Sequence, residues 1–303
     1  MEPTFEIYLY GMIVRTTAHL LKDRYPDVDG YGEIVETHRF AGGETGAAAV
    51  LLASWGNRIV VGGPFLGNET REPILGLLGE RGIDCSKLEF DPEFDGVEDL
   101  VLVAGTTRTV FGSFGGYFSA AKKRWSRPDE ESIMHASVVG VDPFFGAESE
   151  EVADMCRAHG RPWVTIDCPP ESPLHTGSAV TVVSAEYLRD HNRNDDPREL
   201  LRAYADMGAG LTIFTFGAKE ILFARRKEPI RSTPAYVVPV KSTLGAGDSF
   251  KAAVIHAVAC GQTDQELVGF AAATAACVCT RFPMASDPPG LAEIHALCRG
   301  SHY

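Results

Sequence analysis

Short apolar runs alternate with helical patterns along most of this 303-residue chain. The runs contain few polar residues, as is typical of strands buried on both faces of a parallel sheet. They occupy residues 5–11, 57–63, 136–142, 162–167, 179–184 and 211–216. Helical patterns stand between them at residues 44–56, 69–81, 149–159 and 197–207. Strands that alternate with helices form βαβ units, so the sequence predicts an α/β fold in three layers, with a mostly parallel sheet covered on both faces.

Two stretches depart from this rhythm. Residues 30–40 and 96–114 alternate apolar and polar side chains, with a turn near Gly105-Thr106. This period of two predicts antiparallel strands outside the main sheet, either as a small projecting lid or as an edge hairpin. No linker interrupts the chain, so we expect one domain over residues 1–303 with lid strands from about 30–40 and 96–118.

The carboxyl-terminal third is predicted to be mainly helical. A β-rich run at residues 236–240 precedes helical patterns at 246–260, 264–281 and about 290–299. Residues 267–280 are uncharged but too short to cross a bilayer.

Charge and cysteine usage narrow the function classes. The formal net charge is −13, which disfavours binding to nucleic acids and to anionic lipid surfaces. The first residues contain no basic segment followed by an apolar one, so no signal peptide is expected. Seven cysteines without C-x-x-C pairs predict reduced, mostly buried thiols. Together these features predict a cytoplasmic protein without nucleic-acid or membrane partners.

The loop at residues 242–250 reads STLGAGDSF. Its glycines precede a helical pattern, and the unpaired N–H groups at a helix N-terminus bind anions. Asp248 directly follows the second glycine, which is a poor choice for a loop that only holds phosphate. Phosphoryl transfer, however, needs donors for the migrating charge beside a carboxylate that accepts the hydroxyl proton. The alternative is that Asp248 only caps the helix.

With this loop and residues 41–56 (AGGETGAAAVLLASWG), the sequence resembles the PfkB, or ribokinase-like, family of sugar and nucleoside kinases. The family signature D-T-x-G-A-G-D-x-F appears at residues 242–250, where the closest likeness is to ketohexokinases and fructokinases. The resemblance implies a Rossmann-like fold with a β lid and a homodimer that forms through the lid. It also implies ATP as phosphoryl donor, Mg²⁺ accompanying ATP without assignable protein ligands, and a small hydroxylated substrate, with a sugar first.

The resemblance also implies roles for individual residues. Asp248 would be the catalytic base, and Gly245, Ala246 and Gly247 would form the anion hole. Nucleotide contacts are implied at Ser184, Thr215, Gly217 and Thr243. Substrate contacts are implied at Thr16, Gly42, Gly43, Ala47 and Arg108. For Arg108 an exposed strand charge is the alternative.

Four positions depart from the family pattern. Thr16 and Ala47 stand where an aspartate and an asparagine usually bind sugar hydroxyls. Ser242 replaces the first aspartate of the loop, and residues 184–187 replace an N-x-x-E segment with Glu186 one place early. Buried hydroxyls without partners are costly, so the substrate is expected to be atypical: a polyol, a modified sugar, a nucleoside or something less polar. A non-catalytic ligand-binding relative is the alternative outside enzymes.

Other polar residues suggest fewer roles. The nine histidines have no metal-ligand spacing, and Cys277 and Cys279 would not face each other on a helix. Asp142 and Asp167 each end a predicted strand, where α/β proteins bind ligands. Asp167 could face the nucleotide, but a capping or loop role is the first expectation for both.

Overall fold

The computed structural model describes residues 4–192 and 195–300; the other residues of the predicted single domain, 1–3, 193–194 and 301–303, lie outside the described part. A nine-stranded sheet forms its centre, in the order β13-β12-β11-β10-β9-β8-β1-β4-β5. Its strands are β1 (Glu6–Tyr10), β4 (Arg58–Gly62), β5 (Asp84–Lys87), β8 (Val138–Val141), β9 (Trp163–Ile166), β10 (Val180–Ser184), β11 (Leu211–Thr215), β12 (Glu220–Ala224) and β13 (Arg231–Pro234). All pairs from β5 to β11 are parallel, and β12 and β13 join antiparallel at one edge. The predicted parallel sheet is confirmed.

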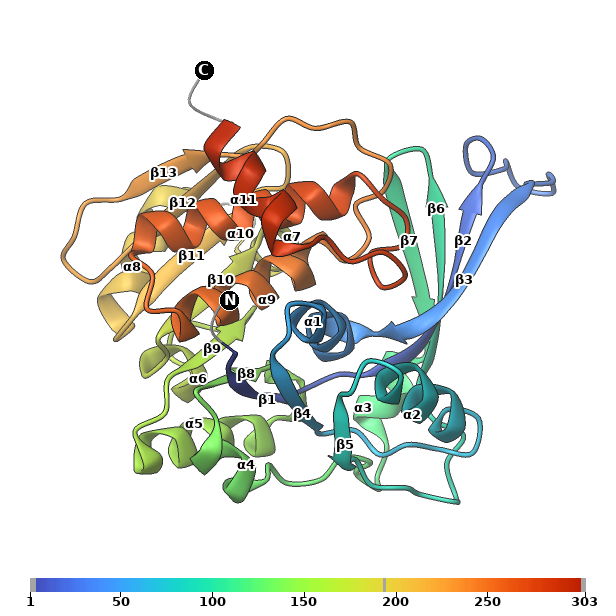
Figure 1. Ribbon diagram of the computed structural model, residues 1–303, viewed down its shortest axis with the longest axis horizontal. Helices are drawn as coiled ribbons and strands as arrows, with labels where there is room; N and C mark the ends of the chain where they lie inside the picture. Colours follow the sequence, from blue (N-terminus) through green and yellow to red (C-terminus); the bar gives the residue numbers. More distant parts are fainter. Residues whose placement is uncertain (1–3, 193–194, 301–303) are drawn as a thin grey trace.

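Helices cover both faces of this sheet (Figure 1). Strand β1 shows why, since Ile7 and Leu9 belong to one apolar core while Tyr8 and Tyr10 belong to the other. The first core also contains side chains of α1 (Gly43–Ser54), α2 (Arg71–Gly79), α9 (Ala246–Ala259), α10 (Asp264–Cys279) and α11 (Leu291–Gly300). The opposite face packs against α4 (Glu130–His135), α5 (Ala147–His159), α6 (Pro173–Thr176), α7 (Ala185–His191) and α8 (Pro197–Met207). The core is therefore a three-layer α/β arrangement.

Local sequence sets several helix ends. Thr263 and Glu266 form a capping box, in which each side chain accepts from the other residue's backbone N–H, and α10 begins there. Asp196 caps α8 by accepting from two backbone N–H groups. Helix α5 ends at Gly160, whose φ of 62° is the left-handed conformation favoured at helix C-termini.

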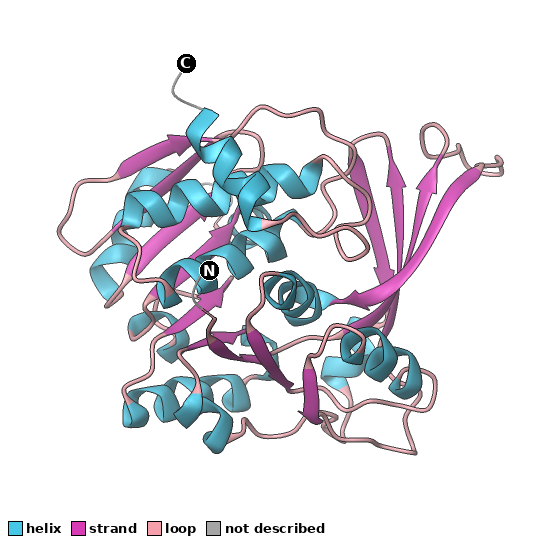
Figure 2. Cartoon of the chain, viewed as in Figure 1, coloured by secondary structure: helices cyan, strands magenta, loops and turns pink. Residues whose placement is uncertain are grey.

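A separate four-stranded sheet projects from the core, in the order β3-β2-β6-β7 (Figure 2). Its strands are β2 (Val14–Leu21), β3 (Ile34–Gly42), β6 (Glu98–Ala104) and β7 (Thr107–Gly112). The predicted turn at Gly105-Thr106 joins β6 to β7.

The predicted lid needs two corrections. Strand β2 was not predicted, yet it lies at the centre of the lid, where it pairs antiparallel with β3 and parallel with β6. The lid is thus a mixed sheet. Residues 113–118, expected to continue the lid strands, instead form the N-cap and most of α3 (Phe114–Ser119), a short helix beside the cavity.

The β-rich run at residues 236–240 forms no strand. The preceding strand β13 already ends at Pro234, and Pro239 lacks the N–H that a ladder needs. Val237 is fully exposed, so its side chain gains none of the packing contacts that stabilise β-branched residues in a strand.

Among the helices of residues 4–192 and 195–300, none combines the length and the apolarity needed to cross a bilayer. The seven cysteines are free thiols that are buried or half-buried, as predicted.

Candidate active site

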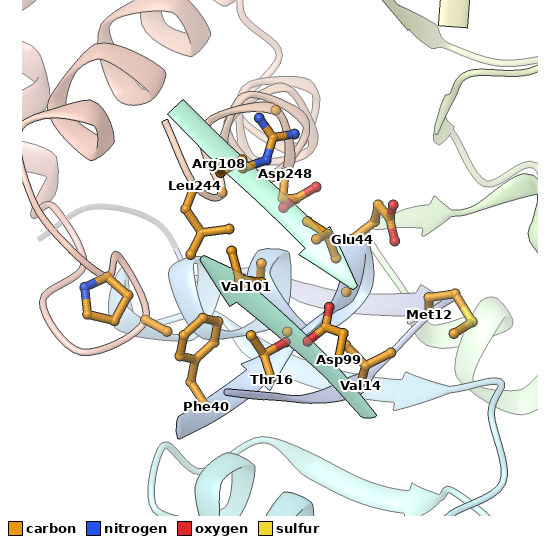
Figure 3. A pocket seen from close by; sticks show the side chains of 18 of the residues that line it. Met12, Val14, Thr16, Phe40, Glu44, Asp99, Val101, Arg108, Leu244 and Asp248 are labelled. Atoms are coloured by element: carbon orange, nitrogen blue, oxygen red, sulfur yellow. The ribbon is translucent and has the colours of Figure 1, made fainter. Parts of the chain in front are cut away.

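A cavity of about 400 Å³ lies between the lid and the carboxyl ends of the parallel strands (Figure 3). Its polar side chains are Thr16, Glu44, Asp99, Arg108 and Asp248. The other side chains that line it are apolar: Met12, Val14, Phe40, Ala47, Val101, Val110, Phe114, Phe118, Phe144, Leu244, Pro283, Met284 and Ala285. Gly42, Gly43, Gly245 and Gly247 complete the lining. Most of the predicted substrate and anion contacts therefore meet in one place.

The N-terminus of α9 opens into this cavity. Gly245 is the N-cap residue, with a φ of 79° that favours glycine, and the Ser249 N–H donates to its carbonyl at 2.9 Å. The Ala246 N–H donates to the Thr243 carbonyl at 3.3 Å, so a bound anion would compete for it. Within the described residues, the N–H groups of Gly247 and Asp248 have no such acceptor, and they leave a partial positive charge at the helix end.

Asp248 is the third residue of α9, and its side chain does not cap the helix. The capping interpretation is therefore wrong. The carboxylate is half-buried and accepts no hydrogen bond from the described part of the chain. Desolvation raises its pKa, whereas the charges of Lys251 and Arg108 lower it. A carboxylate that is free of partners and faces a cavity can take a proton from a bound hydroxyl.

Asp142 holds the surrounding elements together. It is fully buried and accepts from the Met12 N–H at 3.0 Å and from the Thr45 hydroxyl at 2.8 Å. The ammonium group of Lys251 forms an ion pair with its other oxygen. These contacts join the end of β8 to the loop after β1, to α1 and to α9. The predicted capping role of Asp142 is wrong, because no backbone N–H of the following helical turn is bonded to its side chain.

Glu44 was not among the predicted site residues. It lies in the first turn of α1 and lines the cavity. Burial raises its pKa to about 8, and the nearby carboxylates of Asp142 and Asp248 add to this effect. The signal in the sequence was an acidic residue directly after Gly42-Gly43, at the start of a helix with no other charge.

Thr16 and Asp99 form the lid side of the cavity (Figure 3). They are register partners in the β2–β6 pair, so their side chains share one face of the lid. Gly42 packs directly on Thr16, since a Cβ at Gly42 would lie 2.0 Å from the Thr16 hydroxyl. The sequence does not reveal Asp99 as a site residue, because its position beside Thr16 depends on the pairing of β2 with β6, which no local pattern predicts.

Arg108 reaches from β7 toward the core and lines the cavity. Its guanidinium lies 3.9 Å from the Glu186 carboxylate on α7, and the Thr243 hydroxyl donates to the Thr106 carbonyl at 3.3 Å. The lid turn thus touches the core on the side of α7 and the loop before α9. Arg108 remains partly exposed, but it is not merely a solvated strand charge.

The predicted nucleotide contacts lie outside this cavity. Ser184 and Thr215 are register partners at the carboxyl ends of β10 and β11, and Gly217 follows β11 with a φ of 64°. The Ser184 hydroxyl caps α7 and donates to Asp167 at 3.0 Å, so it is already engaged. Asp167 directly follows β9 with a φ of 40°, and its side chain accepts from Ser184 at the start of α7 without capping a helix of the described residues. These residues lie at the carboxyl ends of β9, β10 and β11, which follow β8 and Asp142 in the order of the sheet.

No group of three or more His, Cys, Asp or Glu side chains is placed to hold a metal ion in the part of the chain that the structure describes. Asp142 is already paired with Lys251. A magnesium ion that keeps its water and nucleotide-phosphate ligands needs only one or two protein carboxylates, so the site fits such an ion.

Comparison with known proteins identifies the family. The sequence profile of the pfkB family of carbohydrate kinases matches residues 14–289. No curated protein sequence matches the chain at a significant level.

Solved structures with the same fold cover almost the whole chain. A candidate ribokinase from Agrobacterium tumefaciens is 22% identical, with a TM-score of 0.86 and 98% of each chain covered. Ribokinase of Arabidopsis thaliana, complexed with ribose and ATP, is 17% identical, with a TM-score of 0.78 and 98% of this chain and 99% of that chain covered. A candidate ribokinase II from E. coli, complexed with ATP and Mg²⁺, is 15% identical, with a TM-score of 0.77 and the same coverage.

Proposed function

This chain belongs to the pfkB family of carbohydrate kinases, and we propose that it transfers the γ-phosphate of ATP to a hydroxyl of a small substrate, with Asp248 as the general base. The observation that carries the proposal is the place of the Asp248 carboxylate. It lies in the first turn of α9, faces the cavity under the lid and has no hydrogen-bond donor among the described residues. A hydroxyl bound in the cavity would supply that donor and lose its proton there.

The N-terminus of α9 supports the second half of the proposed reaction. As the phosphoryl group moves, negative charge develops on its oxygens and on the leaving group. The Gly245–Gly247 segment would hold this charge, chiefly through the unengaged N–H groups of Gly247 and Asp248. Donors and base then lie within one helical turn, beside the hydroxyl and the phosphate. The lid would exclude water that otherwise hydrolyses ATP.

The nucleotide is proposed to lie along the row of strand ends next to α9. Thr215 is the last residue of β11, Gly217 follows that strand, and Thr243 lies in the loop before α9. The Ser184 backbone and hydroxyl are occupied by Asp167, so Ser184 would act mainly by positioning this edge. Bound Mg²⁺ would neutralise phosphate charge. The carboxylate of Glu186 on α7, which lies 3.9 Å from Arg108, is a candidate ligand for this ion.

A sugar is the first substrate class to test, because the matching family is one of carbohydrate kinases. A nucleoside or polyol kinase is the second, since Thr16 and Ala47 leave few groups for several sugar hydroxyls. The likeness of the GAGD loop to ketohexokinases and fructokinases keeps fructose among the compounds to be tested.

An ATP-consumption screen tests the proposal. The enzyme is incubated with ATP, Mg²⁺ and a panel of sugars, polyols and nucleosides, and ADP release is measured. We expect release above the acceptor-free rate with at least one acceptor, and loss of that release in Asp248→Asn. Silence across the whole panel, together with ATP binding in calorimetry, would instead favour a non-catalytic ligand-binding relative.

The proposal also covers the domain organisation, the location and the oligomeric state of the protein. The chain would fold as a single domain that includes the lid, and it would act in the cytoplasm. Two copies would form a homodimer through their lids. On the face of the lid opposite the cavity, Leu100 and Phe111 are register partners that are 37% and 53% exposed. A second lid would cover this apolar pair, so Phe111→Ser is expected to convert a dimer to a monomer in light scattering.

A further inference from the structure

The walls of the cavity are less polar than a free sugar requires. A sugar carries hydroxyls around its whole ring, and each hydroxyl that is buried without a partner is costly. The cavity is lined by the side chains of Phe114, Phe118 and Phe144, with the Phe118 and Phe144 rings 6.1 Å apart. Leu244 and Met284 contribute further apolar surface. Such walls favour an apolar or aromatic body over a polyhydroxylated one.

Asp99 is the polar exception on the lid side of the cavity. Its side chain points to the same face as Thr16, between apolar neighbours of β2 and β6 that include Val14 and Val101. Its Oδ1 atom is buried and has no hydrogen-bond partner in the described residues. Buried polar atoms without partners are rare in folded proteins, and one that borders a cavity is suited to a ligand's hydrogen-bond donor.

The charges around the cavity indicate which ligand groups it favours. The carboxylates of Asp99 and Asp248 border it together with the guanidinium of Arg108, whereas Glu44 is mainly protonated at neutral pH because its pKa is raised to about 8. Burial raises the pKa of Asp99 to about 6, with the Thr16 hydroxyl counteracting the shift, so Asp99 is mainly ionised at neutral pH. One oxygen of this ionised carboxylate has no partner, which favours an N–H or O–H donor, and its charge repels an anionic substrate.

From these observations we infer that the acceptor is an alcohol built on an apolar or aromatic ring, and that this ring donates a hydrogen bond to Asp99 while its hydroxyl faces Asp248. The inference rests on the proposed kinase activity, since Asp248 defines which end of the cavity receives the reacting hydroxyl. Free sugars are then poor acceptors, and nucleosides or amino-substituted aryl alcohols are good ones.

Matched acceptors test the substrate class. Ribose is compared with uridine and adenosine, which add a ring, and benzyl alcohol with 3-aminobenzyl alcohol, which adds a donor. N3-methyluridine and N6,N6-dimethyladenosine remove ring N–H donors. We expect kcat/KM for the best ring-bearing acceptor to exceed that for ribose and fructose by tenfold or more, and to fall by about tenfold when its ring donor is removed.

The outcomes separate this inference from the kinase proposal. Preference for ribose or fructose would contradict the inference and leave the kinase proposal standing. If no acceptor is phosphorylated, the kinase proposal fails, and calorimetry of the same compounds decides the inference. Binding of the ring-bearing donors but not of ribose would still support the cavity assignment, whereas no binding of any of them would overturn it.

The variant Asp99→Val tests the residue itself, with Glu98→Val as a matched control. Glu98 is adjacent on β6 but points to the opposite face, where it pairs with Arg15 at 2.5 Å. We expect Asp99→Val to raise the KM of the best ring-bearing acceptor tenfold or more, with kcat and the KM for ATP nearly unchanged. Asp99→Asn, which keeps an acceptor oxygen, should recover part of the loss.

Folding of the variant is not expected to confuse the result. Asp99→Val removes a buried oxygen without a partner and introduces a β-branched residue into a strand, which offsets the lost hydrogen bond from Thr16, so its Tm should stay close to that of the wild type. An unchanged acceptor KM in a folded Asp99→Val protein, or equal effects of Asp99→Val and Glu98→Val, would overturn the assignment.

Discussion

Lys251 of α9 and Asp142 at the end of β8 form an ion pair whose two side chains are fully buried. The pair lies one helical turn from Asp248 and joins α9 to the loop after β1 through Met12. Lysine is almost never fully buried without a partner. The position of the proposed base therefore depends on a charge pair deep in the core.

We predict that Lys251→Met destabilises the fold by about 3–5 kcal/mol, because it leaves the Asp142 charge buried and unpaired. Asp142→Asn alone should also destabilise. The double variant should lose less than the sum of the two, since neither charge then remains alone. Urea unfolding of the four proteins measures this coupling, and strictly additive effects would contradict a specific pair.

Arg108 should set the acid limit of activity. Its charge lowers the pKa of Asp248, so its removal raises that pKa, and a base must be ionised to act. Arg108→Met is therefore expected to move the acid limb of the kcat/KM profile to higher pH by up to about one unit.

Arg39→Met is the control for that shift, because Arg39 pairs in register with Thr17 and is exposed on the lid face that points away from the cavity. The two variants should differ in their pH profiles. A shift of the same size in both would show that the effect comes from the overall charge of the lid.

Glu44 should make the ligand-free protein less stable as the pH rises. Its pKa is about 8 in the folded chain, against 4.5 as its ordinary value, so the folded state binds the proton more tightly. Stability from this group is therefore present below pH 4.5 and is lost as the pH rises toward 8. Glu44→Gln should match the wild type near pH 5 and have a Tm about 2–5 °C higher at pH 9. Parallel Tm curves for the two proteins would contradict this.

How far the sequence predicts this structure depends on how local each signal is. The parallel strands and the helix after Gly245 were predictable, because their apolar periods and glycine signals lie within a few residues. The run at 236–240 was misjudged for the opposite reason. Its β propensity is real, but the run pairs with no strand in the described part of the chain.

In the site, too, residues with local sequence signals could be predicted, and residues that depend on distant contacts could not. The place of Asp248 beside the cavity could be predicted because its neighbours in sequence, the two glycines, are also its neighbours in the structure. Asp142 and Lys251 lie 109 residues apart in the chain, and Asp99 borders the site only through its pairing with Thr16 on β2. A lysine within the apolar stripe of α9 was the one local sign that a buried carboxylate must be near.

The most direct test of the account is a single-turnover measurement on Asp248→Asn with ATP and the best acceptor from the screen. Loss of the base is expected to slow phosphoryl transfer by about 10²–10⁴-fold. The Kd for ATP, measured by calorimetry, should stay within about twofold, since the N–H groups of α9 remain in place. Transfer at a near-normal rate in this variant would contradict Asp248 as the base and the mechanism built on it.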